Sequence, residues 1–389
     1  MRMSAFRRAM AAAALGAILA LSGCSGGNDP KPAPEPSPAP APDSTPSPEP
    51  TPRELTPNEQ LVADIAARAS EGLICVVEYV GNTVTFLTAD GEELGTLNVG
   101  VNPAAMVATA DKNQVYIANS GNGEVVRITF APEPSIERVR VGTRPMALAL
   151  DEEAGLLYVA DYYLNSIRML DIRLMSLVGT IQLEAKGFAE REDPPDCCFD
   201  PLDGTVLEGR RPVSCALSPD GKRLFTGNIG TYDESIVDLE ASAEVGKYDG
   251  VIGMRDVVLS PDGTYLLIAG VGSEVIESNE LIVRLAADGS EVARIHIGKD
   301  VAAVAWQGST VAALAKETGE FCLIDPETWT VSRTLQMEPG IADVSLSADG
   351  SRAYVGNSDT GDVTCLDTAT LDTVWTVEAL ADPRFILAL

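Results

Sequence analysis

The sequence PVSCALSPDGKRLFTGN, residues 212–228, contains the pattern that decides the fold. Two alternating apolar segments of strand length flank the turn Ser218-Pro219-Asp220-Gly221. In such a turn proline presets one central residue, aspartate bonds back to its own backbone, and glycine takes the position that tolerates positive φ. Similar turns recur as Ser260-Pro261-Asp262-Gly263 and Ser347-Ala348-Asp349-Gly350. The stretch therefore predicts a β-hairpin that is repeated along the chain.

The hairpin belongs to a longer unit of four short strands that recurs seven times. The first strands of the units are expected to start at Pro103, Pro145, Pro212, Arg255, Val301, Ile341 and Pro383. The spacings are 42, 67, 43, 46, 40 and 42 residues, and the long one contains an insertion at residues 186–210. A period of 40–45 residues with four strands per unit is typical of propeller blades.

The two ends of the repeat region complete each other. Residues 383–389 supply a first strand with nothing after it, whereas residues 73–80, 83–89 and 93–99 supply three strands without a first. Joining them produces a seventh blade and removes the exposed edge that an open ring would leave. The sequence predicts an all-β, seven-bladed β-propeller over residues 71–389, closed by a composite N- and C-terminal blade.

The N-terminal residues predict export and lipid attachment. Three arginines precede an uncharged apolar run from Ala9 to Leu21, which has the layout of a signal peptide and is too short to span a bilayer. The run ends in Leu21-Ser22-Gly23-Cys24, which resembles the lipobox of bacterial lipoproteins. That resemblance implies a signal peptide over residues 1–23 and lipid attachment at Cys24. An ordinary signal peptide or an uncleaved anchor is the alternative.

A linker and a helix are expected between the anchor and the first blade. Residues 24–55 are rich in proline, which favours a disordered, extended spacer. A short helix is predicted over residues 56–70, since Thr56, Pro57 and Glu59 form the pattern of an N-terminal capping box. Leu61, Val62 and Ile65 would give this helix one apolar face.

Charge excludes one class of partner. The whole chain has a formal net charge of −29, and removing the three arginines of residues 1–23 makes it −32. A surface this acidic repels nucleic acid, and no nucleic-acid partner is predicted. The lipid on Cys24 predicts a membrane partner and a location at the cell membrane or outer membrane, facing the periplasm or the cell exterior.

The repeats resemble a known family. The units at residues 213–228, 344–357 and 148–171, with the repeat start VGTRP at 141–145, are similar to YVTN-type repeats of the lactonase-like seven-bladed propellers. The resemblance implies the fold. It leaves function open, because members of that family include binding proteins, surface-layer proteins and enzymes.

Candidate ligand-binding residues gather where first strands begin and second strands end, because both meet on one face of a propeller. That face is predicted to carry Arg144, Arg211, Arg255, Asp256, Asp343, Arg384, Asn119, Asp161 and Asn228. The arginines are suited to gripping a carboxylate or phosphate. The alternative is structural: the arginines pair with Asp256, Asp300 and Asp343 between blades, while Asn and Asp cap turns.

Catalytic and cofactor motifs are not recognised in the sequence. His296 is the sole histidine and falls on an outermost strand, so a Ser-His-Asp hydrolase, a histidine-ligated haem and a His-rich metal centre are excluded. No metal or cofactor is therefore predicted. A hydrolase that uses carboxylates alone, or calcium-activated water, remains open.

Six cysteines follow Cys24. A bridge from Cys197 or Cys198 to Cys215 would staple the insertion to the next strand, whereas a vicinal Cys197–Cys198 bridge would be strained. Cys75, Cys322 and Cys365 are expected to be buried free thiols.

Two functions remain. The first is a tethered binding or scaffold module for a small ligand, glycan or protein partner, presented on the face around the channel mouth. The alternative is an extracytoplasmic enzyme of lactonase-like type. An open cavity lined by carboxylates or arginines would favour a ligand site, whereas a channel filled by side chains would favour a scaffold.

Overall fold

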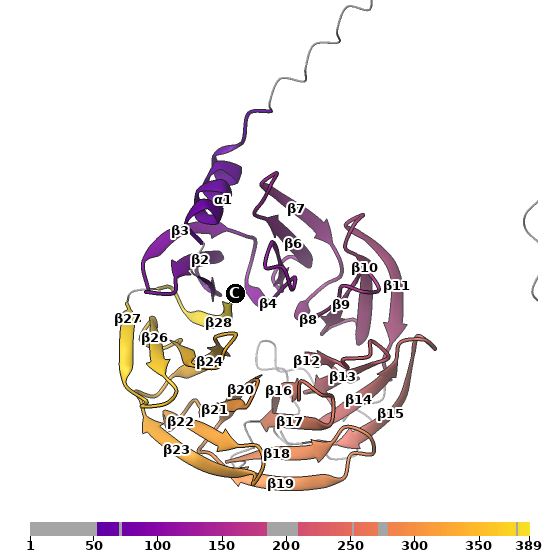
Figure 1. Cartoon of the computed structure of the whole chain (residues 1–389). Helices are drawn as coiled ribbons and strands as arrows, with labels where there is room; N and C mark the ends of the chain where they lie inside the picture. Colours follow the sequence, from indigo (N-terminus) through magenta and orange to yellow (C-terminus); the bar gives the residue numbers. More distant parts are fainter. Residues whose placement is uncertain (1–52, 70–71, 185–208, 251–252, 271–278, 379) are drawn as a thin grey trace, which may run out of the picture. The chain divides into compact units, whose positions relative to one another are not determined.

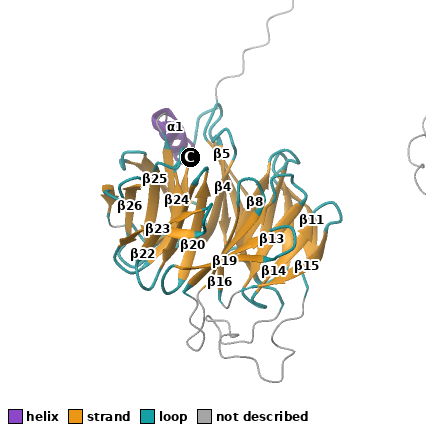
Figure 2. Ribbon diagram, turned by 60° about the horizontal axis from the view of Figure 1, so that its bottom comes forward, coloured by secondary structure: helices purple, strands orange, loops and turns teal. Residues whose placement is uncertain are grey.

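Seven four-stranded sheets form the architecture of this computed structural model, within the residues that the structure describes: 53–69, 72–184, 209–250, 253–270, 279–378 and 380–389. Figure 1 shows the sheets as blades around a central axis, and Figure 2 shows loops on both faces of the ring. All strand pairs are antiparallel, in the order first to fourth from the axis outward. The predicted seven-bladed propeller is confirmed.

The innermost strand of each blade lies nearest the axis. These strands are β4 (Pro103–Ala108), β8 (Pro145–Asp151), β12 (Pro212–Leu217), β16 (Met254–Leu259), β20 (Val301–Gln307), β24 (Ile341–Leu346) and β28 (Pro383–Ala388). Six begin at the predicted residue, and β16 begins one residue earlier than predicted.

The second strands carry most of the core. They are β1 (Leu73–Glu78), β5 (Gln114–Asn119), β9 (Leu156–Asp161), β13 (Arg223–Asn228), β17 (Tyr265–Gly270), β21 (Thr310–Ala315) and β25 (Arg352–Asn357). Nearly every residue of these strands is buried, because neighbouring blades cover both faces. The third strands are β2 (Thr83–Thr88), β6 (Glu124–Thr129), β10 (Ser166–Asp171), β14 (Asp233–Asp238), β18 (Glu280–Leu285), β22 (Glu320–Asp325) and β26 (Asp362–Asp367).

The outermost strands form the rim. They are β3 (Glu93–Asn98), β7 (Ser135–Arg140), β11 (Ser176–Gln182), β15 (Ala243–Asp249), β19 (Glu291–His296), β23 (Thr330–Gln336) and β27 (Thr373–Val377). Six of these strands, all except β7, carry a register shift, and the skipped residue is an exposed valine in β11, β15, β19 and β27. Such bulges disrupt the regular edge that would otherwise pair with another sheet.

The ring closes as the sequence predicts. β28 pairs antiparallel with β1, so that Val77 faces Phe385, Val76 faces Ile386 and Cys75 faces Leu387. Beyond the strands, the N–H of Leu389 donates to the carbonyl of Leu73 at 2.8 Å. The last strand thus becomes the innermost strand of the blade that the first three strands begin.

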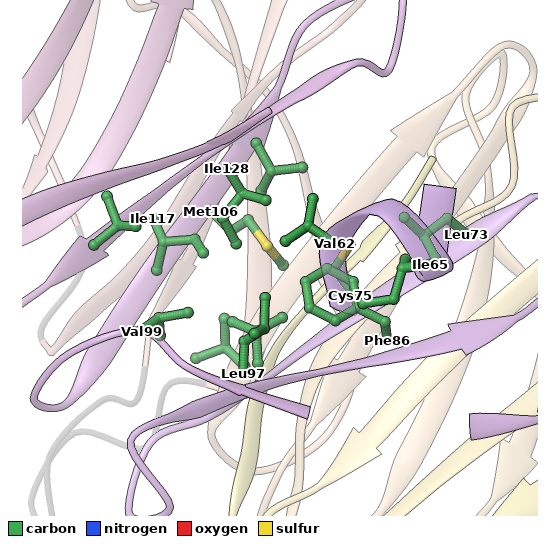
Figure 3. Packing of buried hydrophobic residues seen from close by; sticks show 14 of the residues in the cluster. Val62, Ile65, Leu73, Cys75, Phe86, Leu97, Val99, Met106, Ile117 and Ile128 are labelled. Carbon is green, nitrogen blue, oxygen red and sulfur yellow. The ribbon is translucent and has the colours of Figure 1, made fainter. Parts of the chain in front are cut away.

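Helix α1 (Pro57–Arg68) begins at the predicted capping box, in which Thr56 and Glu59 bond to each other's backbone N–H. Its Val62 and Ile65 are fully buried, and Figure 3 shows them beside the core of the composite blade and the next blade. The helix packs on β3 and β7. Gly95 of β3 makes the approach possible, since a Cβ there would lie 2.7 Å from Leu61 Cδ1.

None of the described residues forms a helix with the length and apolarity that a membrane crossing requires. The expectations for the signal peptide, for Cys24 and for residues 24–52 of the predicted 24–55 linker lie outside the described residues, and they stay predictions. Residues 53–55 are described and form no helix or strand.

Candidate functional site

An open channel of about 570 Å³ runs along the axis, lined by the innermost strands of all seven blades. Much of its wall is apolar, with small side chains such as Ala104, Ala302 and Ala342. Four of the predicted site residues line it: Arg255, Asp256, Asp343 and Arg384. The channel is thus an open cavity that contains charged groups.

Asp256 joins three blades. Its carboxylate accepts the hydroxyl of Ser214 on β12 at 2.9 Å and the backbone N–H of Val304 on β20 at 3.3 Å. Burial raises the pKa of Asp256 above its ordinary value, although these hydrogen bonds favour the charged form. The residue therefore serves as a bridge around the channel wall while remaining half-buried beside the cavity.

Asp343 is the channel carboxylate with fewer protein contacts. One of its oxygens accepts the N–H of Ile386 on β28 at 2.6 Å. Burial raises the pKa of Asp343 well above its ordinary value, and the negative charge of Asp256 raises it further. The charge on Asp256 thus disfavours the ionised form of Asp343, and Asp343 is the better placed to hold a proton or to meet a ligand.

We expect Asp343→Asn to stabilise the protein at neutral pH by about 0.5–2 kcal/mol, a typical gain for one favourable substitution. The folded state binds the Asp343 proton more tightly than the unfolded chain does. Asp343 therefore contributes most to the free energy of unfolding below the ordinary pKa of an aspartate. This contribution falls as the pH rises through the raised pKa of the folded state. Asparagine cannot ionise, yet it still offers an oxygen to Ile386.

Urea unfolding at pH 4 and pH 8 checks this prediction. The difference between variant and wild type should be small at pH 4 and favour the variant at pH 8. Asp372→Asn, which removes an exposed carboxylate, serves as the control for net charge. A variant less stable than wild type at pH 8 would show that the Asp343 charge is needed for structure.

Two of the arginines lie at the channel mouth with acidic neighbours. Arg384 binds both oxygens of Asp382 through Nε at 2.8–2.9 Å and lies over the Tyr79 ring. Arg255 reaches across to the next blade, where its Nε lies 3.7 Å from Asp300. The cross-blade pair with Asp300 matches the structural alternative. Among the described residues neither Asp256 nor Asp343 forms an ion pair with an arginine, and their carboxylates accept backbone N–H groups of neighbouring innermost strands.

Arg144 and Arg211 meet away from the channel wall. Both guanidinium groups lie 5.0–5.3 Å from the ring centres of Tyr162 and Tyr163. Arg144 also donates to the Tyr163 hydroxyl at 3.1 Å. The four side chains form a cluster, called here the arginine–tyrosine cluster, between two neighbouring blades.

Asn119, Asp161 and Asn228 are fully buried and occupied by protein groups. Asn119 donates to the carbonyl of Val99, and Asp161 accepts the N–H and hydroxyl of Thr143. Asn228 donates to Asp233 and Ser235 within its own blade. These contacts are structural, and ligand contact at these residues stays a prediction.

The cysteines of the described residues are free thiols: Cys75, Cys215, Cys322 and Cys365. Burial, with a smaller contribution from Asp256, raises the pKa of Cys215 to about 12, so this thiol is a poor nucleophile. The free thiol of Cys215 contradicts the predicted bridge from Cys197 or Cys198 to it. Cys197 and Cys198 lie outside the described residues, and a bridge between these two stays a prediction.

Sequence reasoning missed two features. Ser214 occupies the same position of its innermost strand as Asp256 and Asp343, and the repeat alignment itself could have revealed it. Arg210 was assigned to the insertion, yet its guanidinium is buried and binds Asp233, Glu184 and Glu244 at 2.6–3.0 Å. No local pattern signals the Arg210 cluster, because two of its acidic partners belong to the following blade.

These features define a propeller with an open, charged channel, and sequence comparison gives it a family. The model of the lactonase, 7-bladed β-propeller family matches residues 82–276, half of the chain. The protein belongs to that family. No curated protein matches the sequence.

Solved structures show the same fold at low identity. A periplasmic gluconolactonase of Pseudomonas aeruginosa is 16% identical, with a TM-score of 0.63 over 82% of this chain and 99% of that one. A putative 6-phosphogluconolactonase of Bacteroides fragilis is 15% identical, with a TM-score of 0.62 over 82% and 99%. The Kuenenia stuttgartiensis hydrazine synthase is 19% identical, with a TM-score of 0.62 over 77% and 92%. The likeness to proteins with such different names shows the fold and leaves the activity open.

Proposed function

We propose that the protein is a lipid-anchored, extracytoplasmic binding module whose central channel takes a small polyhydroxylated molecule of the sugar-lactone or sugar-acid type. The lipobox-like sequence at Cys24 supports the anchor and the location. The family, and the gluconolactonase among the similar structures, support the ligand class. A small-molecule role is favoured over a protein scaffold.

The observation that carries the proposal is the open channel. About 570 Å³ is within the range of small-molecule sites, and two carboxyl groups and two arginines reach it. The hydroxyl groups of such a ligand can donate hydrogen bonds to the carboxyl groups and accept them from the arginines. Protein scaffolding needs no such cavity.

Lactone hydrolysis is a second candidate, favoured by the raised pKa values of Asp256 and Asp343. A carboxyl group with a raised pKa can keep its proton near neutral pH and serve as an acid, while a second carboxylate serves as a base. The base would take a proton from the water that attacks the lactone carbonyl. The acid would protonate the ring oxygen as the carbon–oxygen bond breaks. Both groups are already present in the channel.

Binding and turnover can be separated with glucono-δ-lactone and gluconate as probes. Calorimetry with gluconate measures binding, and a pH-stat assay with the lactone measures hydrolysis above the spontaneous rate. We expect gluconate to bind, and Ala342→Phe, which places a large side chain in the channel wall, to weaken binding at least tenfold. Val374→Phe on the exposed rim is the matched control.

The outcomes discriminate the candidates. Binding without hydrolysis supports the binding module, whereas hydrolysis that Asp343→Asn abolishes supports the lactonase. Equal gluconate affinity in wild type and in the folded Ala342→Phe variant would place the ligand outside the channel and overturn the proposal.

A further inference from the structure

We propose that the arginine–tyrosine cluster of Arg144, Arg211, Tyr162 and Tyr163 is a binding subsite for an oxyanion, carboxylate or phosphate, carried by a small ring-bearing ligand. The proposal goes beyond the channel, because none of these four residues is among those that line it.

The geometry presents the side chains together. Arg144 comes from the segment before β8 and Arg211 from the segment before β12, so two successive blades deliver them to one place. Each guanidinium lies about 5 Å from both tyrosine rings. The rings stand nearly perpendicular, at 82° with centres 5.1 Å apart, and together they contact both guanidinium groups.

Charge supports an anion. The chain has a formal charge of −29, yet the guanidinium groups of Arg144 and Arg211 lie beside the same two tyrosine rings. The carboxylate of Asp161 contacts Arg144 only at its backbone N–H, while the Arg144 guanidinium bonds to the neutral Tyr163 hydroxyl. Guanidinium groups bind carboxylate and phosphate through paired N–H donors, and the rings hold them in place.

The exposed tyrosine supports a ring on the ligand. Tyr163 is 41% exposed, in contrast to its buried neighbour Tyr162 at 6%. An aromatic face at a polar surface offers apolar contact beside hydrogen-bonding groups. A ring-bearing anion would therefore contact Tyr163 while its oxyanion contacts the arginines.

Arg211 also occupies a costly backbone position. Its φ is +53°, a left-handed conformation that glycine or asparagine adopts more readily. The equivalent positions before other innermost strands hold Asn102, Asp300, Gly340 and Asp382, all also at positive φ. An arginine there is unfavourable for the backbone, which is consistent with a role for its side chain.

Three probes test the proposal by calorimetry at low ionic strength: glucuronate, inorganic phosphate and neutral glucose. We expect glucuronate, phosphate or both to bind wild type, and Arg144→Gln to weaken that binding at least tenfold. Arg173→Gln removes the same charge from an exposed site of the same blade and should change nothing. Tyr163→Ala should weaken glucuronate more than phosphate. Thermal denaturation establishes that each variant is folded.

The result assigns the source of the oxyanion. Stronger binding of glucuronate indicates a sugar acid, and equal or stronger binding of phosphate indicates a phosphate group. Failure of both anions to bind wild type, or equal anion binding by wild type and Arg144→Gln, overturns the proposal. Ala342→Phe distinguishes the two sites: loss of gluconate binding in this variant with retained anion binding supports an independent subsite. Loss of both gluconate and anion binding in Ala342→Phe would place the anion in the channel and overturn the proposal of a separate subsite.

Discussion

Replacing Arg210 with methionine is expected to destabilise the protein by about 3–5 kcal/mol, the cost of breaking a buried ionic network by removing one partner. The Arg210 side chain is 3% exposed and bonds to Asp233, Glu184 and Glu244. Asp233 and Glu244 are themselves largely buried, so the variant would leave carboxylates out of water without their main cation.

The position of Arg210 in the chain increases the expected loss of stability. Glu184 and Arg210 lie on either side of residues 185–208 along the chain, and their ion pair joins the two ends of that segment. Lys247 contacts Asp233 at 3.3 Å but is half exposed, so it compensates poorly. Loss of Arg210 therefore affects both the junction between blades and the base of the insertion.

Urea unfolding of the purified protein measures the effect. Arg173→Met, on the exposed surface, should change the unfolding free energy by less than about 0.5 kcal/mol. Arg210→Lys should fall between the two, because lysine keeps the charge and loses the planar fork. A loss below about 1 kcal/mol in Arg210→Met would mean that solvent reaches the carboxylates and that the network matters little.

The fold could be predicted from the sequence because the patterns that define it are local. Strand alternation repeats in each unit and a Ser-Pro/Ala-Asp-Gly turn in three of them, so the starts of six innermost strands follow from spacing alone. Closure followed from counting the strands that each end supplies. The start of β16 is the exception: Met254 is fully buried as the first strand residue, and the exposed Arg255 comes second.

The site could be predicted only in part from the sequence, because it depends on contacts between blades. The sequence grouped Arg144 and Arg255 at strand starts, yet Arg144 precedes β8 and meets tyrosines, whereas Arg255 is the second residue of β16 and lines the channel. A shift of β16 by one residue decides which position Arg255 takes, and the rotamer of a long side chain and the adjacent blade then decide which neighbour it reaches. Likewise Asp343 binds a backbone N–H of β28, 43 residues further along the chain.

Removing the last strand, residues 383–389, is expected to abolish the cooperative unfolding transition. β28 is held on both sides, since its ladder pairs with β1 and its N–H groups donate to Asp343 and Ser345 of β24. The approach to the strand is also fixed, because the N–H of Ala381 donates to the buried Glu78 at 2.7 Å. Without β28, the second strand of the composite blade becomes an exposed apolar edge.

A single substitution tests the same closure with less disruption. Ile386→Ala removes a 2%-exposed side chain from the cluster that joins the composite blade to the last complete blade. We expect a loss of about 2–5 kcal/mol, as for other large-to-small substitutions in a core. Val374→Ala, at a 48%-exposed bulge on the rim, should cost less than about 0.5 kcal/mol.

We would measure urea unfolding by circular dichroism for both point variants and for the truncated chain. A truncated chain that still unfolds cooperatively near the wild-type midpoint would show that the ring does not depend on its final strand. Because Asp343 and Ile386 are joined by one hydrogen bond, the strand that closes the ring also forms part of the channel wall. A closure defect that leaves the protein folded should therefore also weaken ligand binding in the channel.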